Sequence, residues 1–286
     1  MTDLPALNVV VVAYGSPELL DRCLRALGQD IPVLVIDNSS SDRVHEVVAA
    51  HSCHYVDPGR NSGFAAGVNR AMAELGPGHG DVLLLNPDAE VTGEVVSALQ
   101  RTMHADGSER VACVSPSLTR DDGSQERVVW PFPTPWRAWI EAFGLGALGT
   151  RAGFVIGAVL LLRGEAIDAI GLLDERFFLY AEETDWQRRA ASAGWSALTD
   201  TTLNARHTGA ATSEDSDKRE AIFHASAERY IRKWYGPVGW WIWRAGVVVG
   251  AGVRALTGPN RTRQRLRLRI YLRGPMLWEQ EKARPA

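Results

Sequence analysis

The feature that most constrains the fold is a series of short aliphatic runs, each followed by a segment with helical spacing. The first run, LNVVVVA at residues 7–13, shows no alternation of polar and apolar residues. This pattern is typical of a strand that is buried on both faces of a parallel sheet. Residues 17–27 then carry apolar side chains at helical spacing, and residues 33–36 form the next aliphatic run. Together the three segments predict a β-α-β unit.

The same alternation continues through the first third of the chain. Helices are expected at residues 43–50 and 63–75, and strands at residues 54–56 and 81–85. This order predicts an α/β fold in which helices flank a mostly parallel central sheet. Ligands of such sheets bind beyond the carboxyl ends of the strands. Three polar clusters are expected at that edge of the sheet: Ala13-Tyr14, Asp37-Asn38 and Asn86-Pro87-Asp88.

The pattern becomes less regular after the aliphatic run at residues 111–115. Residues 130–139 contain three prolines and three tryptophans, which suits an irregular surface on the acceptor side of a binding site. Residues 154–162 form a further strand-like run, and a helix is expected at residues 164–170. Helical spacing returns at residues 218–235.

Composition and charge exclude several classes of protein. The chain has 286 residues and a formal net charge of −3, so it has no overall attraction for nucleic acid. Its three cysteines, Cys23, Cys53 and Cys113, lack zinc-site spacing and are expected to be buried free thiols of a reducing cytoplasm. The N-terminus has no signal-peptide pattern, which also favours a cytoplasmic location. The uncharged stretch between Arg244 and Arg254 has nine residues, too few to span a bilayer.

Asp88 and His207 are candidate metal ligands. Asp88 follows a predicted buried strand, where an aspartate is often only a turn former or helix cap. At the ligand edge it also suits Mg²⁺ or Mn²⁺, which bind one or two carboxylates together with phosphate oxygens and water. His207 precedes a polar loop and could add an imidazole ligand, although a lone histidine is more often an ordinary hydrogen-bonding residue.

Glu182, Glu183 and Asp185 place three carboxylates within four positions at a predicted helix start. Mutual repulsion would raise the pKa of at least one carboxyl group, so the cluster could hold a general base. The alternative is a structural acidic turn that complements the helix dipole and pairs with Arg188 and Arg189 one turn later.

Residues 61–69, NSGFAAGVN, open a helix with small residues and allow a ligand to approach the backbone closely. The segment is not a GxGxxG fingerprint, and the chain contains no P-loop. A dinucleotide-dependent oxidoreductase is therefore disfavoured.

Six segments in this order resemble the inverting family 2 glycosyltransferases with the GT-A fold, in particular their bacterial rhamnosyltransferase-like branch. The resemblance runs from about residue 7 to residue 213. It rests on VVVVAYGSPELLDRCLRAL, VLVIDNSSSD, RNSGFAAGVNRA, LLLNPDAEV, FVIGAVLLLRGEAIDAIGLLDERFFLYAEETDWQRRAASAGW and RHTGAATS.

The resemblance implies a role for each matching position. Asp37 corresponds to the acidic residue that binds the nucleobase, and Asp88 to the last acidic position of a DxD-type metal motif in which Asn86 replaces the first. His207 would complete a site for Mg²⁺ or Mn²⁺. The residues expected to bind the nucleotide and donor sugar are Ala13, Tyr14, Asp37, Asn38, Asn61, Gly63 and Asn86.

The general base implied by the resemblance is Glu183, the second member of the Glu182-Glu183 pair. A glutamate stands here where the family usually has an aspartate. The longer side chain moves the carboxylate by about one bond length, so Glu182 and Asp185 remain alternatives.

The expected reaction is an inverting, metal-assisted transfer of a sugar to a hydroxyl of a glycan, glycolipid or small molecule. The expected donor is dTDP-rhamnose, and the alternatives are a dTDP- or UDP-linked galactofuranosyl, glucosyl or N-acetylhexosaminyl donor, or a non-catalytic nucleotide-sugar-binding protein. A lipid-linked glycan is among the expected acceptors, and a homodimer is an expected assembly. The expected domains are a catalytic domain at 1–235, with a nucleotide-sugar half to about 115 and an acceptor and catalytic half from about 116, and a Trp/Arg-rich helical extension at 236–286.

The extension combines tryptophans with five arginines that alternate between residues 261 and 269. Such a segment suits peripheral contact with an anionic membrane at the inner face of the cell membrane. The alternative is a helix that packs on the protein with a solvated basic face.

Overall fold

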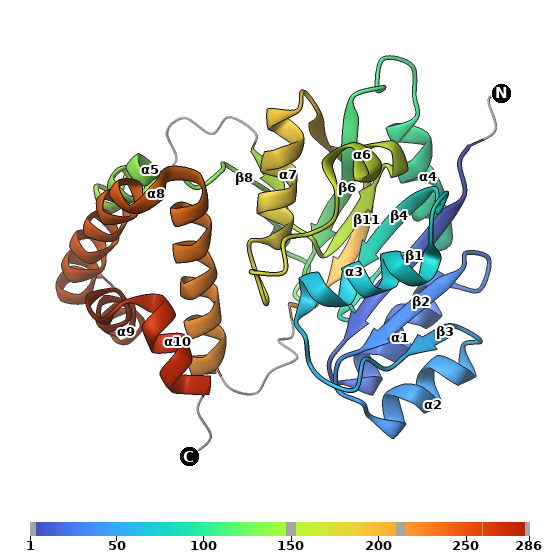
Figure 1. The fold of residues 1–286 in the computed structure, drawn as a ribbon, viewed down its shortest axis with the longest axis horizontal. Helices are drawn as coiled ribbons and strands as arrows, with labels where there is room; N and C mark the ends of the chain where they lie inside the picture. Colours follow the sequence, from blue (N-terminus) through green and yellow to red (C-terminus); the bar gives the residue numbers. More distant parts are fainter. Residues whose placement is uncertain (1–3, 147–152, 210–215, 259, 284–286) are drawn as a thin grey trace. The chain divides into compact units, whose positions relative to one another are not determined.

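The computed structural model describes residues 4–146, 153–209, 216–258 and 260–283. The chain divides into two compact units, which we call the sheet unit and the helical unit (Figure 1). The sheet unit consists of Met1–Trp130, Gly153–Glu175 and Glu182–Thr212, and the helical unit of Pro131–Ala152, Arg176–Ala181 and Ser213–Ala286.

The elements of the sheet unit are β1 (Leu7–Ala13), α1 (Pro17–Leu27), β2 (Val33–Asp37), α2 (Asp42–Ala50), β3 (His54–Val56), α3 (Phe64–Leu75), β4 (Asp81–Leu85), β5 (Ala89–Glu90), α4 (Gly93–Met103), β6 (Val111–Thr119), β7 (Gln125–Glu126), β8 (Val129–Trp130), β9 (Phe154–Val155), β10 (Val159–Leu162), α6 (Gly164–Ile170), α7 (Glu182–Ser192) and β11 (Ser196–His207). The expected α/β class is confirmed, and the elements of the first third lie within one residue of their expected bounds. The single strand-like run expected at 154–162 is two strands, separated by residues 156–158.

The central sheet has the strand order β3-β2-β1-β4-β10-β6-β11-β5, with β7 paired to β6. The pairs β3-β2, β2-β1, β1-β4 and β6-β11 are parallel. Strand β10 runs antiparallel to both of its neighbours, β4 and β6. Six of the described strands of the sheet therefore run in one direction. Strand β10 runs against them between the two parallel parts, and the short strands β5 and β7 are also reversed.

Helices cover both faces of this sheet. Both faces of β1 are covered, which explains why its sequence shows no alternation of polar and apolar residues. Val9 and Val11 pack in one core, and Val10 and Val12 pack in the other. Helices α1, α2 and α4 contribute to the first core, and α3, α6 and α7 to the second. Gly67 lets α3 approach β1, because a Cβ atom there would lie 2.8 Å from Cγ1 of Val12.

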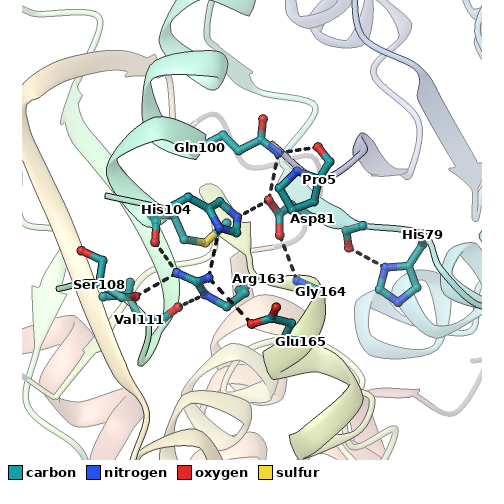
Figure 2. Close-up of polar contacts among 12 residues, drawn as sticks. Pro5, His79, Asp81, Gln100, His104, Ser108, Val111, Arg163, Gly164 and Glu165 are labelled. Atoms are coloured by element: carbon teal, nitrogen blue, oxygen red, sulfur yellow. Dashed lines mark hydrogen bonds and ion pairs between the residues drawn. The ribbon is translucent and has the colours of Figure 1, made fainter. Parts of the chain in front are cut away.

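A buried polar network ties the sheet together at the edge opposite the expected ligand edge (Figure 2). The carboxylate of Asp81, the first residue of β4, accepts hydrogen bonds from Gln100 Nε2 (2.9 Å), His104 Nε2 (2.7 Å) and the backbone N–H of Gly164 (3.0 Å). Arg163 donates from Nη1 to His104 Nδ1 (3.1 Å). Because a guanidinium can only donate, His104 accepts at Nδ1 and carries its proton on Nε2.

The helical unit contains α5 (Pro135–Ala142), α8 (Ser216–Thr257), α9 (Arg261–Arg273) and α10 (Pro275–Ala283). Helix α8 is two helices joined at a kink (Figure 1), where Gly236 has a φ of 65° and Pro237 follows. The buried core of this unit includes Trp240 and Tyr271. No helix among the described residues is long and apolar enough to cross a membrane.

Candidate active site

The first part of the site lies where β1 and β2 end. The backbone N–H of Asn38 donates to the carbonyl of Ala13 (2.9 Å), which joins the two strand ends. The Asn38 side chain reaches the start of α3 by donating from Nδ2 to the carbonyl of Gly63 (3.0 Å). Tyr14 is 44% exposed beside this junction, and Asn61 Oδ1 accepts from the Gly63 N–H (3.0 Å). Five predicted nucleotide-site residues therefore belong to one edge of the sheet.

Asp37 is fully buried within this junction. Its Oδ1 accepts from the backbone N–H (2.9 Å) and hydroxyl of Ser39, and its Oδ2 from the N–H of Ser41 (2.9 Å) and the hydroxyl of Tyr55 (3.0 Å). Burial and the hydrogen bond to Asp37 raise the pKa of Tyr55, so its hydroxyl stays a donor. A nucleobase N–H would have to displace one of these donors to reach the Asp37 carboxylate.

Asp88 and His207 come together through strand pairing. Strand β5 begins immediately after Asp88 and pairs antiparallel with the end of β11, which places Ala89 opposite His207. Asp88 Oδ1 lies 3.4 Å from His207 Nε2, and both side chains are largely buried. A carboxylate oxygen and an imidazole nitrogen at this separation fit two ligands of one Mg²⁺ or Mn²⁺ ion.

Glu126 is a member of this cluster that sequence reasoning missed. It lies in β7, and its Oε2 is 2.7 Å from His207 Nδ1. Arg120 holds the same carboxylate from the other side, at 3.4 Å. A carboxylate on Nδ1 orients the imidazole and leaves Nε2 directed at Asp88, which is the usual support of a metal-binding histidine. The contact spans 81 residues, so no local pattern could have indicated it.

The two carboxylates also control the protonation of His207. Burial alone would lower the pKa of His207, but hydrogen bonds and charge from Asp88 and Glu126 outweigh it and raise this pKa to about 9. Without a cation His207 is therefore an imidazolium at neutral pH, and cation binding would release its proton.

Helix α7 is fixed against the sheet by side chains that follow its acidic start. The amide of Gln187 makes a two-point contact with the backbone of Val155, accepting from its N–H (2.8 Å) and donating to its carbonyl (2.7 Å). Trp186 donates from Nε1 to the carbonyl of Gly171 (2.8 Å). Asp185 forms a buried ion pair with Arg189 at 3.1 Å, as expected for the structural alternative. The position of the helix start is thereby set by contacts to two other segments, at Val155 and at Gly171.

Glu183 lies over Gly157, in the loop between β9 and β10. A Cβ atom at Gly157 would be 3.5 Å from Cγ of Glu183. The next residue, Ala158, accepts a hydrogen bond from the backbone N–H of Asn86 (2.9 Å), two residues before Asp88. This chain of contacts brings the predicted base and the predicted metal ligand to the same edge of the sheet.

The carboxyl groups of Glu182 and Glu183 are both withdrawn from solvent. Burial and the charge of Glu183 raise the pKa of Glu182 well above its ordinary value, and burial also raises the pKa of Glu183. Oε2 of each residue accepts no hydrogen bond from the described residues. Glu182 is 5% exposed, and Glu183 is the more open of the two.

The polar loop that follows His207 also contacts the site. The backbone carbonyl of Asp88 accepts from the N–H (3.1 Å) and the hydroxyl (3.2 Å) of Thr208, so the start of the polar loop touches the site. The last part of the RHTGAATS segment, 210–213, lies outside the described residues.

Comparisons with known proteins identify the family of the chain. The model of the family described as glycosyl transferase family 2 matches residues 8–171, more than half of the chain. N-acetylglucosaminyl-diphospho-decaprenol L-rhamnosyltransferase of Mycobacterium tuberculosis is 27% identical over 303 residues, covering 93% of this chain and 97% of the relative.

Two solved structures share the fold. The mannosyltransferase PcManGT of Pyrobaculum calidifontis, in complex with GDP-Man and Mn²⁺, has a TM-score of 0.63 at 14% identity and covers 99% of this chain and 89% of its own. Glucosyl-3-phosphoglycerate synthase of Mycobacterium tuberculosis, in complex with Mn²⁺, UDP and glucosyl-3-phosphoglycerate, has a TM-score of 0.55 at 15% identity, with coverages of 80% and 79%. The expected GT-A type of fold is confirmed, and the chain belongs to glycosyl transferase family 2.

Proposed function

We propose that this glycosyltransferase moves a hexosyl unit from a nucleoside-diphosphate sugar to an acceptor hydroxyl by a single displacement that inverts the anomeric carbon. One observation carries this proposal. Glu183, with an oxygen that accepts no described hydrogen bond, shares the sheet edge with the facing pair Asp88 and His207. A base and a pair of cation ligands at one edge are what transfer from a diphosphate leaving group requires.

Glu183 acts as the general base in this proposal. It takes the proton of the acceptor hydroxyl while the acceptor oxygen bonds to the anomeric carbon. The bond between that carbon and the diphosphate breaks, and its electron pair leaves with the nucleoside diphosphate. Asp185 is a weaker candidate because its carboxylate pairs with Arg189. Glu182 is weaker because burial and the charge of Glu183 raise its pKa well above the ordinary value, which disfavours the carboxylate form that a base requires.

Asp88 and His207 would hold a divalent cation, Mg²⁺ or Mn²⁺. Such a cation would neutralise the charge that develops on the diphosphate. Two protein ligands leave room for the diphosphate oxygens and water, which suits Mg²⁺ in particular. No group of three or more His, Cys, Asp or Glu side chains suited to a metal occurs among the described residues.

The nucleotide would lie across the ends of β1 and β2, against Ala13, Tyr14, Asp37, Asn38, Asn61, Gly63 and Asn86. We propose rhamnose from dTDP-rhamnose as the sugar and a lipid-linked glycan as the acceptor. The rhamnosyltransferase named above supports both, because the similarity extends over nearly the full length of each chain. Galactofuranosyl, glucosyl and N-acetylhexosaminyl donors remain alternatives for the same chemistry.

The substitution Glu183→Gln tests the role of the base. We expect kcat to fall by about 10²- to 10⁴-fold, the usual contribution of a positioned base, while donor binding persists. The measurement is release of nucleoside diphosphate, followed with and without acceptor, together with donor affinity by calorimetry.

Glu182→Gln is the matched variant, one position away. If it shows the loss and Glu183→Gln does not, the base is Glu182. Nucleoside diphosphate release from the wild type that never depends on an acceptor would indicate a hydrolase, and no release with or without acceptor would indicate a non-catalytic binding protein.

A further inference from the structure

The second half of α8, residues 237–257, shows an apolar face to solvent. A helix that faces water normally presents polar side chains there. The exposed positions recur at intervals of three or four residues and are Val238, Trp241, Ala245, Val249, Val253 and Leu256. Trp241 is 60% exposed and Leu256 is 74% exposed. This half of α8 is therefore apolar on its exposed face as well as on its buried face, where Trp240, Trp243 and Val247 lie.

Helix α5 extends the same apolar surface. Trp136 is 65% exposed at its start, and Phe143 is 69% exposed just beyond its end. Helices α5 and α8 enclose an open groove of about 500 Å³ whose lining is entirely apolar: Trp136, Trp139, Val238, Trp241, Ile242 and Ala245. We call this surface the tryptophan groove. Exposed apolar surfaces of this kind mark sites of interaction with a partner or a membrane.

Helix α9 carries an exposed row of arginines. Arg261, Arg265 and Arg269 are four residues apart, so they lie on one face of the helix. All three are exposed and pair with no acidic side chain among the described residues. The other alternating arginines differ from these three: Arg263 is exposed but pairs with Glu220 at 2.7 Å, and Arg267 is half-buried. We call Arg261, Arg265 and Arg269 the arginine row.

The tryptophan groove and the end of α9 meet at Arg244. This side chain donates to the carbonyls of Tyr271 (2.7 Å) and Leu272 (2.8 Å) in α9. Its guanidinium also lies over the ring of Trp241, 4.8 Å from the centroid. Leu272 is 61% exposed and, by helical spacing, shares the face of the arginine row. The apolar and basic surfaces are thus parts of one helical unit that meet at a defined contact.

We propose that this combined surface docks the enzyme on a bilayer that contains anionic lipids. Tryptophans favour the interface between headgroups and acyl chains, and exposed arginines are attracted to anionic headgroups. A chain with a net charge of −3 has no general attraction for anions, so the attraction must come from a local surface such as the arginine row. A second copy of the chain would bring the same unpaired arginines to the shared interface, whereas an anionic bilayer supplies the missing countercharges. The proposal is independent of the sugar that is transferred.

Vesicle flotation of the full chain tests this proposal. The probes are vesicles of phosphatidylcholine alone and of phosphatidylcholine with 30% phosphatidylglycerol, at low and at high salt. We expect the wild type to float with the anionic vesicles and to lose most of this binding at high salt. The triple change of Arg261, Arg265 and Arg269 to Gln should lower the partition coefficient about 100-fold, since each arginine near such a surface contributes about tenfold at most.

A second variant, Trp136→Gln with Trp241→Gln, removes apolar contact without changing charge and should also abolish flotation. Matched controls on the sheet unit are the triple change of Arg25, Arg43 and Arg70 to Gln, and Trp130→Gln. All four control residues are exposed, so these changes should leave flotation intact.

Circular dichroism establishes that every variant is folded. Equal loss in the controls, or no flotation of the wild type, would overturn the proposal. Light scattering tests the alternative that a second copy of the chain covers this surface. A dimer that dissociates in the tryptophan variant, together with no vesicle binding, would also overturn the proposal.

Discussion

At the scale of single residues, Arg163 is a charged side chain that is buried within the sheet unit and held there by hydrogen bonds. It is 5% exposed, and its guanidinium donates to the carbonyls of Met103, Ser108 and Val111 as well as to His104. These bonds join the end of α4, the start of β6 and the end of β10 (Figure 2). One side chain thus donates to three backbone carbonyls from separate segments, of which that of Ser108 also accepts from the backbone N–H of Val111 (2.9 Å).

Replacement of Arg163 by Met should lower the free energy of unfolding by about 3–5 kcal/mol, the cost of breaking a buried, hydrogen-bonded charge cluster. Urea denaturation followed by tryptophan fluorescence measures this change. Arg101→Met is the control, because Arg101 is exposed on the same helix α4 and should change stability by at most about 0.5 kcal/mol. Similar losses in both variants would contradict the structural role given to Arg163.

Glu126 allows a prediction about the candidate cation site. Glu126→Gln weakens the hydrogen bond that orients His207, so the affinity for Mn²⁺ in the presence of a nucleoside diphosphate should fall by about 10- to 100-fold. Titration calorimetry measures this affinity without requiring turnover. Arg120→Gln removes only the outer partner of Glu126 and should have a smaller effect. An unchanged affinity in Glu126→Gln would leave His207 without its proposed support.

At the scale of elements, the local sequence pattern predicted where strands and helices lie, but it did not predict how the strands pair. The run at residues 7–13 indicated a doubly buried strand because each of its faces meets a different core. The reversed direction of β10 could not be predicted, since an aliphatic run reads alike in both directions. Glu126 escaped notice for a related reason, because its partner His207 is joined to it only by the pairing of distant strands. The family resemblance supplied the roles that spacing left open.

The arginines at 261–269 illustrate the same limit. Their alternation suggested one basic stretch, but the helix separates the exposed row of Arg261, Arg265 and Arg269 from Arg263, which pairs with Glu220, and from the half-buried Arg267. The composition change expected near residue 236 coincides with the kink of α8 at Gly236. Local composition indicated the position of the kink, but only the three-dimensional structure shows which side chains are exposed to solvent.

Helix α8 also carries a titratable pair that should make the helical unit sensitive to acid. A hydrogen bond from His224, with charge from His224 and Arg263, lowers the pKa of Glu220 to about 2. Burial lowers the pKa of His224, so at neutral pH this imidazole is neutral and donates to Glu220 from Nε2. The carboxylate of Glu220 is favoured by the fold, and so is the neutral form of His224.

Both shifts act in the same direction on stability. Below about pH 6.5 the unfolded chain binds the His224 proton more readily, and below about pH 4.5 it also binds the Glu220 proton more readily. The melting temperature should therefore fall as the pH decreases from about 6.5 to about 2, as measured by circular dichroism. Glu220→Gln should flatten the fall below pH 4.5, and an unaltered profile in that variant would disprove the contribution of Glu220.

At the scale of the whole molecule, donor binding should appear as a gain in stability. A nucleotide sugar at 100 times its Kd stabilises the folded chain by about 2.7 kcal/mol. A panel of dTDP-, UDP- and GDP-linked sugars, scanned by thermal shift with and without Mn²⁺, should identify the donor, and we expect dTDP-rhamnose to give the largest shift.

Asp88→Ala should remove the part of this shift that depends on Mn²⁺. If that variant responds to Mn²⁺ as the wild type does, Asp88 is not a ligand, and the proposed cation site is wrong. The nucleotide contacts at the ends of β1 and β2 are unchanged by the substitution, so a smaller, Mn²⁺-independent shift should persist.

The position of β10 has a consequence for the chain while it is being synthesised. Strands β1 to β4 leave the ribosome first, but one side of β4 has no partner until β10 follows about 75 residues later. At 5–20 residues per second, this edge stays open for roughly 4–15 s. An unpaired aliphatic strand edge is a template for aggregation. The nascent chain therefore passes through an interval in which chaperone protection determines how much of it reaches the finished sheet.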